Sequence, residues 1–157
     1  MPKIQIGGIL QSSELALIQL LGLSPGAQAT SAVLRALGEQ AISAQAVVEC
    51  RDCGGGATLA FTVSQANLEQ ALGAVEAAAK ELGAQAVQAV PNVGLIAIHG
   101  PHFADRPAIA GTMFSALALA GIEPLLITSS ISTVAGVIAA QDIPRAVAVL
   151  KETFLLP

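Results

Sequence analysis

The sequence predicts an α+β protein built from two similar modules, of which the first is inserted into the second. One succession of strand, turn, helix, hairpin and helix occurs twice along the 157 residues. A strand-like segment at the N-terminus has no place in the first copy and can complete the second. The composition, with 54% hydrophobic residues, is sufficient for a hydrophobic core in each copy.

The first copy begins with an apolar run over residues 15–21 that ends at Gly22, which predicts a strand. A Pro/Gly turn follows, and then a helix with apolar side chains on one face. Next come strands over 44–50 and 58–63 around a glycine turn at 54–56. A second helix and a final strand over 85–90 complete a βαββαβ module. The apolar helix positions are Val33, Leu34 and Leu37 in the first helix, and Leu68, Leu72, Val75 and Leu82 in the second.

The second copy repeats these elements in the same order. Its first strand is predicted over 93–99 and ends at Gly100, and its hairpin strands over 125–130 and 134–139. The first helices of the two copies align without a gap, 34–42 against 114–122. The apolar helix positions are Ile109, Met113, Leu117 and Ala120 in the first helix, and Ile143, Val147, Leu150 and Phe154 in the closing helix.

The second copy ends in its closing helix and leaves no room for a final strand. A strand over residues 3–9 precedes the first copy, and the simplest closure is that this strand completes the second module. The expected domains are therefore residues 14–90, and residues 1–13 together with 91–157. Both are ferredoxin-like βαββαβ modules.

Charge and hydropathy argue against nucleic-acid and membrane partners. Only 11% of residues are charged and the net charge is −4, which gives no basic surface for phosphates. The charge-free stretch 124–141 contains serines, threonines and a glycine and fits a buried hairpin better than a membrane span. No secretory signal is recognisable, so a cytoplasmic location is expected. The mean hydropathy of +0.69 and open sheet edges predict a homodimer.

Two βαββα units with a Pro-containing turn after the first strand resemble the ACT domain, and the pair resembles the tandem at the C-terminus of aspartate kinases. The resemblance covers nearly the whole chain. It rests on the segments 100–107, 109–122 and 126–130, and on 59–63 before the helix from Asn67. It implies binding of lysine, threonine or a related amino acid where modules meet, commonly between two chains, and allosteric regulation of a kinase domain.

Several positions depart from the family pattern, so the resemblance does not fix the ligand. The acidic residue that usually precedes the first Pro-Gly turn is absent from Leu23-Ser24-Pro25-Gly26. Glu49-Cys50 stands where Gln-Asn is common, and Pro107-Ala108 where Pro-Gly is usual. Ile131 and Thr133 occupy positions where Glu and Lys are frequent.

Three functions remain open at this point. The leading hypothesis is a stand-alone amino-acid sensor that resembles the regulatory part of aspartate kinase without the kinase domain. The second is a regulatory subunit that docks on a separate aspartate kinase chain, and the third is an interaction domain that has lost its ligand. No catalytic constellation, phosphate-binding glycine loop or cofactor motif is present in the sequence, so an enzyme is not expected.

An amino-acid ligand needs N–H donors for its carboxylate and an acceptor for its ammonium group. The helix that follows each first strand can offer free N–H groups, and Glu49 is the best placed acceptor. Ser24 could equally be only an N-cap and Gly26 only a turn residue, while an N-cap and a solvated charge explain Asp105 and Arg106 almost as well. The candidate ligand-binding residues are Ser24, Pro25, Gly26, Ala27, Glu49, Cys50, Asp105, Arg106, Pro107, Ala108, Thr128, Ser129 and Ser130.

The remaining reactive side chains favour structural interpretations. Cys50 and Cys53 form a C-x-x-C, but a tetrahedral metal site needs two further ligands and the sequence has no second pair, so no metal is expected. The favoured interpretation is that Cys50 and Cys53 are residues at the tip of a hairpin. His99 and His102 flank Gly100-Pro101 and are expected at a surface or an interface rather than in catalysis.

Overall fold

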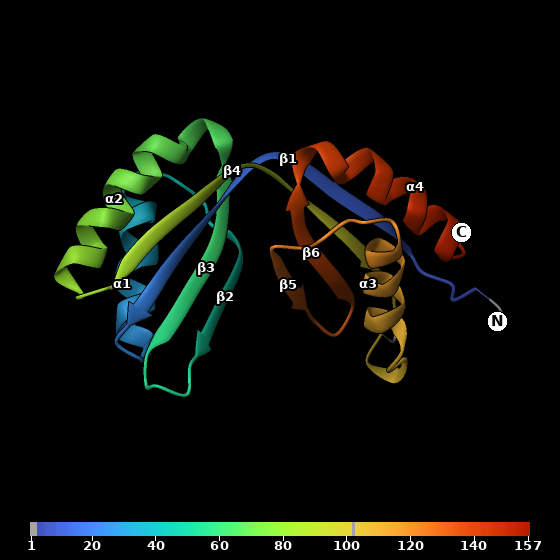
Figure 1. Ribbon diagram of the computed structural model, residues 1–157, viewed down its shortest axis with the longest axis horizontal. Helices are drawn as coiled ribbons and strands as arrows, with labels where there is room; N and C mark the ends of the chain where they lie inside the picture. The colour runs from blue at the N-terminus through green and yellow to red at the C-terminus, as the bar shows by residue number, and fades with distance from the viewer. Residues whose placement is uncertain (1–2, 102) are drawn as a thin grey trace. The chain divides into compact units, whose positions relative to one another are not determined.

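The computed structural model describes residues 3–101 and 103–157. The chain divides into two compact units. The central unit is Glu14–Asn92, and the terminal unit combines the N-terminal residues through Ser13 with Val93–Pro157. Strands β1 (Gly8–Leu23) and β4 (Ala86–His99) each contribute one part to each unit (Figure 1).

The central unit places two helices on one face of its strands (Figure 1). Its strands follow the order β2-β3-β1-β4, and β3 pairs antiparallel with both β1 and β2. Ile18 of β1 lies opposite Phe61 of β3, and both are fully buried in the core beneath the helices. Besides the long strands, the elements are α1 (Ala27–Glu39), β2 (Gln45–Arg51), β3 (Ala57–Ser64), η1 (Gln65–Asn67) and α2 (Leu68–Glu81).

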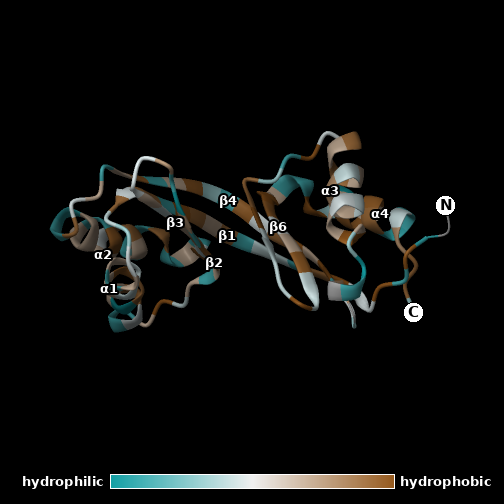
Figure 2. Cartoon of the chain, turned by 90° about the horizontal axis from the view of Figure 1, so that it is seen from below, coloured by the Kyte–Doolittle hydropathy of each residue, from teal (hydrophilic) through white to brown (hydrophobic). Residues whose placement is uncertain are grey.

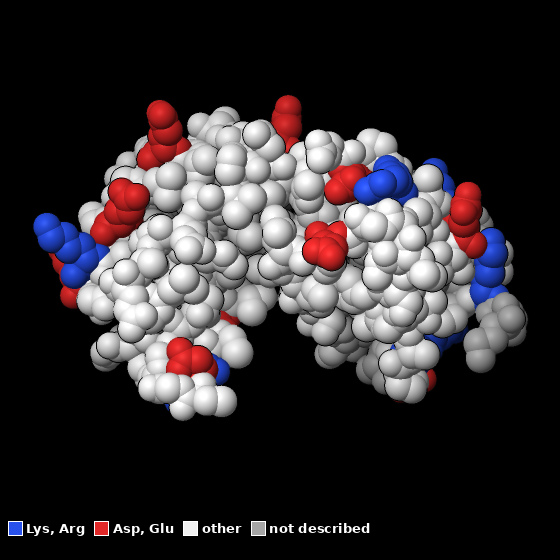
Figure 3. All heavy atoms as spheres, in the orientation of Figure 1, with Lys and Arg blue, Asp and Glu red and all other residues white. Residues whose placement is uncertain are grey.

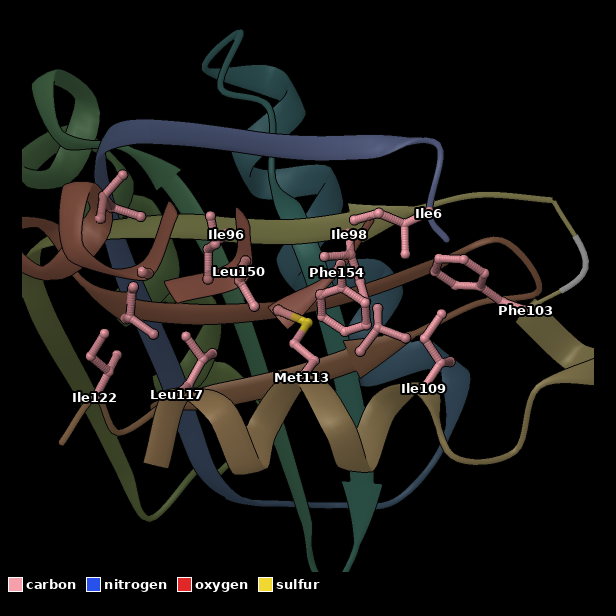
Figure 4. Close-up of a cluster of buried hydrophobic side chains, with 14 residues drawn as sticks. Ile6, Ile96, Ile98, Phe103, Ile109, Met113, Leu117, Ile122, Leu150 and Phe154 are labelled. Carbon is pink, nitrogen blue, oxygen red and sulfur yellow. The ribbon is translucent and has the colours of Figure 1, made fainter. Parts of the chain in front are cut away.

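The terminal unit has the same plan, with strand order β1-β4-β6-β5. β6 pairs antiparallel with β4 and with β5. Figure 4 shows its core, in which Met113 of α3 lies among side chains from the strands and from α4. Besides the long strands, its elements are η2 (Phe103–Asp105), α3 (Ile109–Leu119), β5 (Leu126–Ser129), β6 (Thr133–Ala139), η3 (Ala140–Asp142) and α4 (Ile143–Thr153).

The end of the strand expected at 3–9 and the strand expected at 15–21 are joined in β1, and the strands expected at 85–90 and 93–99 are joined in β4. The polar segment between the first pair does not break β1, because its backbone lies beside other strands. Glu14 and Asn92 mark the places where the expected breaks lay, since both have positive φ, 59° and 55°. The prediction of a strand over 3–9 was wrong in its bounds, because regular pairing begins only at Gly8.

The N-terminal segment belongs to the terminal unit. The Gly7 N–H donates to the His99 carbonyl at 2.7 Å, and Gln5 forms an isolated parallel bridge with Leu155. Gly94 of β4 approaches β1 so closely that a Cβ there would lie 2.9 Å from the Ser12 carbonyl oxygen. The first part of β1 therefore lines β4 within this unit.

Helix α2 buries smaller side chains than the leucine pattern predicted. In α2 the buried positions are Ala71, Val75 and Ala79, whereas Leu68 and Leu72 are half-buried at its flank. Small side chains on the facing surface let a helix lie close to a sheet. No helix among the described residues is long and apolar enough to cross a membrane.

Candidate functional site

The turn between β1 and α1 ends in a glycine that caps the helix. Gly26 is the N-cap, with φ 139° and ψ 149°, and no side chain caps this helix end. The interpretation of Ser24 as the N-cap was therefore wrong, because the helix starts two residues later. The Gly26 carbonyl accepts from the Ala29 N–H at 3.2 Å. The first N–H groups of a helix have no acceptor within the helix, so a carboxylate at this end can accept from them.

A surface hollow of about 460 Å³ lies at this helix end. Ser24, Pro25, Gly26 and Ala27 line it together with the start of α1, and so does Glu81 from the end of α2. Glu81 is the one ionisable side chain among the lining residues. Glu81 was not among the predicted site residues, because it lies on the second helix, far from Gly26 along the chain. The sequence signal that could have pointed to Glu81 is its position in the last turn of a helix that ends before Gly83.

Glu49 lies near the same helix but outside the lining of this hollow. The Thr30 hydroxyl in the first turns of α1 donates a hydrogen bond to the Glu49 carboxylate on β2. This contact agrees with the expectation that Glu49 stands beside the first turn. Cys50 follows it on β2 and is exposed, with its thiol 3.6 Å from the Arg51 carbonyl oxygen.

The second predicted turn has a different structure from the first. Asp105 belongs to η2, and the N-cap of α3 is Ala108, so the interpretation of Asp105 as the cap of this helix was wrong. The 3₁₀ turn displaces the helix start by three residues. The Arg106 guanidinium donates to the Gln5 carbonyl at 3.0 Å. Arg106 therefore holds the N-terminal segment, and it also lines a small hollow of about 250 Å³.

The hairpin candidates lie at the edge of the terminal unit's strands. Thr128 and Ser129 belong to β5 and pair with Ala135 and Val134 of β6. Ser130 follows in the turn, where its N–H donates to the Thr133 carbonyl at 2.8 Å. Thr128 and Ser129 therefore lie on an edge strand, whose neighbour in the sheet is β6.

The other reactive side chains form no metal centre among the described residues. Cys50 and Cys53 are free and exposed at the β2–β3 hairpin. The Asp52 carboxylate between them accepts from the Gly54 and Gly56 N–H groups at 2.7 and 3.0 Å, which orders the tip. A Cβ on Gly8 would lie 2.7 Å from the His99 imidazole. His102 lies outside the described residues.

Charged side chains are few in the sequence, at 11% of residues. On the face drawn in Figure 3, wide uncharged areas separate the Lys, Arg, Asp and Glu side chains, some of which lie next to a side chain of opposite charge. Arg145 in the first turn of α4 and Asp142 at its N-cap form an i,i+3 ion pair at 2.8 Å.

Comparison with known proteins confirms the family resemblance. Residues 96–154 match the ACT domain family, which covers α3, β5, β6 and α4. The fold is shared with the ligand-free regulatory subunit of aspartate kinase from Thermus thermophilus, at 24% identity and a TM-score of 0.85. That match covers 96% of this chain and 99% of the other. The regulatory subunit from Thermus flavus gives 24% identity, a TM-score of 0.86 and the same coverage.

Longer kinases contain a similar region. Aspartate kinase from Synechocystis is 27% identical with a TM-score of 0.85, and the match covers 97% of this chain but 28% of that one. The aspartokinase of Bacillus sp. (strain MGA3) is 22% identical over 154 residues, 98% of this chain. The chain spans 38% of the length of that curated relative. The similar part of such kinases is thus a fraction of the enzyme.

Proposed function

We propose that the protein is an allosteric sensor that binds an amino acid at the N-terminal end of α1 and regulates aspartate kinase activity. The observation that carries the proposal is the hollow at Ser24–Ala27, where a helix end without a side-chain cap lies beside the Glu81 carboxylate. An amino acid offers the complementary pair of charges. Its carboxylate would accept from the first N–H groups of α1, and its ammonium group would bind an acidic side chain.

Two carboxylates compete for the ammonium group. Glu81 lines the hollow directly, whereas Glu49 reaches the helix through Thr30. A ligand confined to the hollow would use Glu81. A ligand that extends along the first turn of α1 would use Glu49, with Cys50 as a neighbour, as the sequence pattern favours. Lysine, threonine or a similar amino acid fits either arrangement, because every amino acid carries the same two charged groups.

The two units are proposed to be ACT modules, with the one over 14–90 inserted into the one formed by 1–13 and 91–157. The antiparallel strand orders support this proposal, since both units have two helices on one face of four strands. The second turn, Asp105–Ala108, and the hairpin Thr128–Ser130 are then the corresponding ligand positions of the second module. We further propose a cytoplasmic homodimer.

A regulatory subunit that docks on a separate kinase chain is the second candidate. It is favoured by the likeness to a chain in the solved structure of aspartokinase alpha and beta subunits, with a TM-score of 0.84 and coverage of 94% of this chain and 97% of that one. Co-purification with a kinase chain that lacks a tandem of its own would support this candidate.

Calorimetric titration against the twenty amino acids tests the proposal. Binding of one or a few amino acids, with affinity lost in Gly26→Val, supports a sensor. Gly73→Val on α2 is the control, because Gly73 also has open space around it but lies inside a helix and away from the hollow. If none of the twenty binds, the sensor proposal fails and an interaction domain without a ligand takes its place.

A further inference from the structure

The β2–β3 hairpin of the central unit carries two free thiols at its exposed end. Cys50 is the penultimate residue of β2, Cys53 stands in the turn, and both side chains are exposed. Every residue from Glu49 to Gly55 is exposed, and Figure 1 shows the turn as a loop beyond the ends of both strands. A small oxidant in solution can therefore reach both sulfur atoms. The C-x-x-C spacing is typical of dithiols that exchange with disulfides.

The thiols are close along the chain, and the Cys50 thiol faces the turn. Its sulfur lies 3.6 Å from the Arg51 carbonyl oxygen, on the side of Cys50 that leads to Cys53. Cys53 is the second residue of a turn that the Gly55 N–H closes by donating to the Asp52 carbonyl at 3.3 Å. Two residues separate the cysteines, so a bond between them closes a short loop at a small cost in chain entropy.

The closed hairpin keeps the two cysteines apart. Arg51 pairs with Ala57, and the Asp52 N–H donates to the Gly56 carbonyl at 2.9 Å. An extended chain covers about 10 Å in three residues, whereas the Cα atoms of a disulfide lie roughly 4.4–6.8 Å apart. A disulfide can therefore form only when the end of the hairpin opens. Once formed, it prevents Arg51 and Asp52 from pairing again with β3.

The end of β2 can open at a low cost in free energy. Among the described strands, the neighbour of β2 is β3, and the last three residues of β2 are exposed. Three glycines follow at 54–56, and the hydrogen bonds from Gly54 and Gly56 to the Asp52 carboxylate are also exposed. Segments with few buried contacts and exposed backbone hydrogen bonds open locally without unfolding of the whole unit.

We propose that Cys50 and Cys53 are a redox-sensitive pair, which a low-molecular-weight disulfide such as glutathione disulfide oxidises to an intramolecular disulfide that holds the end of the hairpin open. One thiolate attacks glutathione disulfide, forms a mixed disulfide and releases one glutathione. The second thiolate attacks the mixed disulfide and releases the other glutathione. Two electrons and the two thiol protons thus pass from the cysteines to glutathione. Exposed and strained disulfides are the reversible ones. This inference does not depend on the proposed function.

The opened hairpin would also displace Glu49. Glu49 directly precedes Cys50, and its carboxylate accepts a hydrogen bond from Thr30 of α1. The contact is exposed, and Figure 2 shows hydrophilic residues on α1 and along β2. Water can replace such a contact at little cost, so a bend in β2 at Cys50 and Arg51 is expected to move Glu49 away from Thr30.

Mass spectrometry of the folded protein in glutathione buffers tests the pair. The wild type should lose about two mass units and carry no glutathione, and dithiothreitol should reverse the change. Cys50→Ser and Cys53→Ser should each stop at a mixed disulfide with one glutathione. A wild type that stays reduced, or that carries only glutathione adducts, in a buffer where both single variants are fully modified would overturn the proposal.

Amide hydrogen exchange tests the opening of the hairpin. In the oxidised wild type, the amides of Asp52, Gly54 and Gly56 should exchange faster than in the reduced protein, while those between β1 and β3 stay unchanged. Asp52→Ala removes two hydrogen bonds of the closed tip and should raise the equilibrium constant for oxidation by up to about fivefold. Asp52→Asn is the matched control and should stay near the wild type. An oxidised hairpin with unchanged amide exchange would overturn the proposed opening.

Calorimetry separates the effect on Glu49 from the proposed function. An amino acid that binds the reduced protein through Glu49 should bind the oxidised protein about tenfold more weakly, as expected when a charge-assisted hydrogen bond is lost. In Cys50→Ser/Cys53→Ser and in Glu49→Ala, the affinities in the two buffers should be equal. Equal affinities in the wild type would reject the displacement of Glu49. If no amino acid binds, the proposed function fails, whereas the mass and exchange measurements still decide on the redox pair.

Discussion

The Thr30 hydroxyl on α1 donates a hydrogen bond to the Glu49 carboxylate on β2, and this contact connects the first turns of the helix to an edge strand. Thr30 directly follows Ala29, which lines the hollow at the β1–α1 turn, and Glu49 contacts Thr30. The contact keeps an acidic side chain beside the positive end of the helix, where a ligand ammonium group could bind it.

Replacement of Glu49 is expected to weaken amino-acid binding. Glu49→Ala removes one charge-assisted hydrogen bond, on the order of 1.5 to 3 kcal/mol, or about ten- to a hundredfold in the dissociation constant. Glu49→Gln should be milder, because it keeps an acceptor oxygen. Calorimetry on both variants measures the effect. Thr30→Val, which removes the hydroxyl but leaves the carboxylate, should change the affinity less than Glu49→Ala.

Glu81→Gln distinguishes the two acceptors for the ammonium group. A ligand that lies within the hollow should bind about tenfold or more weakly to Glu81→Gln, since a charged partner is lost. Glu76→Gln, one and a half turns earlier on α2 and outside the lining of this hollow, is the matched control. If Glu49→Ala, Glu81→Gln and Gly26→Val all leave the affinity unchanged, the site lies elsewhere, and the hairpin at Thr128–Ser130 is the next place to test.

Two glycine-to-alanine replacements should change stability in opposite directions. Gly26 has φ 139° and ψ 149°, a conformation that an alanine adopts at a cost of about 1–3 kcal/mol, so Gly26→Ala should lower the urea midpoint. Gly73 lies inside α2 with open space around it, and Gly73→Ala should raise stability by about 1 kcal/mol. Equal shifts of the two midpoints would contradict the conformation assigned to Gly26.

Gly94→Ala tests how β1 lines β4 in the terminal unit. The added methyl group would stand 2.7 Å from Ile143 Cγ1 and 2.9 Å from the Ser12 carbonyl oxygen. Such crowding should cost about 1–3 kcal/mol of unfolding free energy. Gly111→Ala in the same unit has open space and is the control. A wild-type urea midpoint for Gly94→Ala would show that the N-terminal part of β1 is not where the structure has it.

The tip of the β2–β3 hairpin depends on Asp52. Its carboxylate accepts from two backbone N–H groups, of Gly54 and Gly56. Asp52→Ala should lower stability by up to about 1 kcal/mol, because both bonds are exposed and water replaces them in part. Asp52→Asn keeps the acceptor oxygen and should retain most of the stability. Faster amide hydrogen exchange at Gly54 and Gly56 in Asp52→Ala alone is the local readout.

Local sequence patterns were sufficient to predict the helices, the strands and their order along the chain. The apolar runs, the glycine turns and the helical spacing of residues such as Val33 and Leu37 are local signals, since the periods of strand and helix are properties of short segments. The repeat added the likeness of the two copies and the resemblance to the ACT domain. Glu49 was predicted to stand near the first turn, and it contacts Thr30 of α1, because a strand that follows a helix in such a module returns beside that helix.

The packing of the elements sets where each one stops and which distant residues meet. β1 continues through Glu14 because neighbouring strands satisfy its backbone, and no local pattern records that partnership. Glu81 reaches the hollow at Ser24–Ala27 from the end of α2, and Arg106 binds the Gln5 carbonyl 101 positions away in sequence. Such contacts depend on how elements pack in three dimensions, so the residues of a binding site can be nominated from sequence but its lining is fixed by the fold.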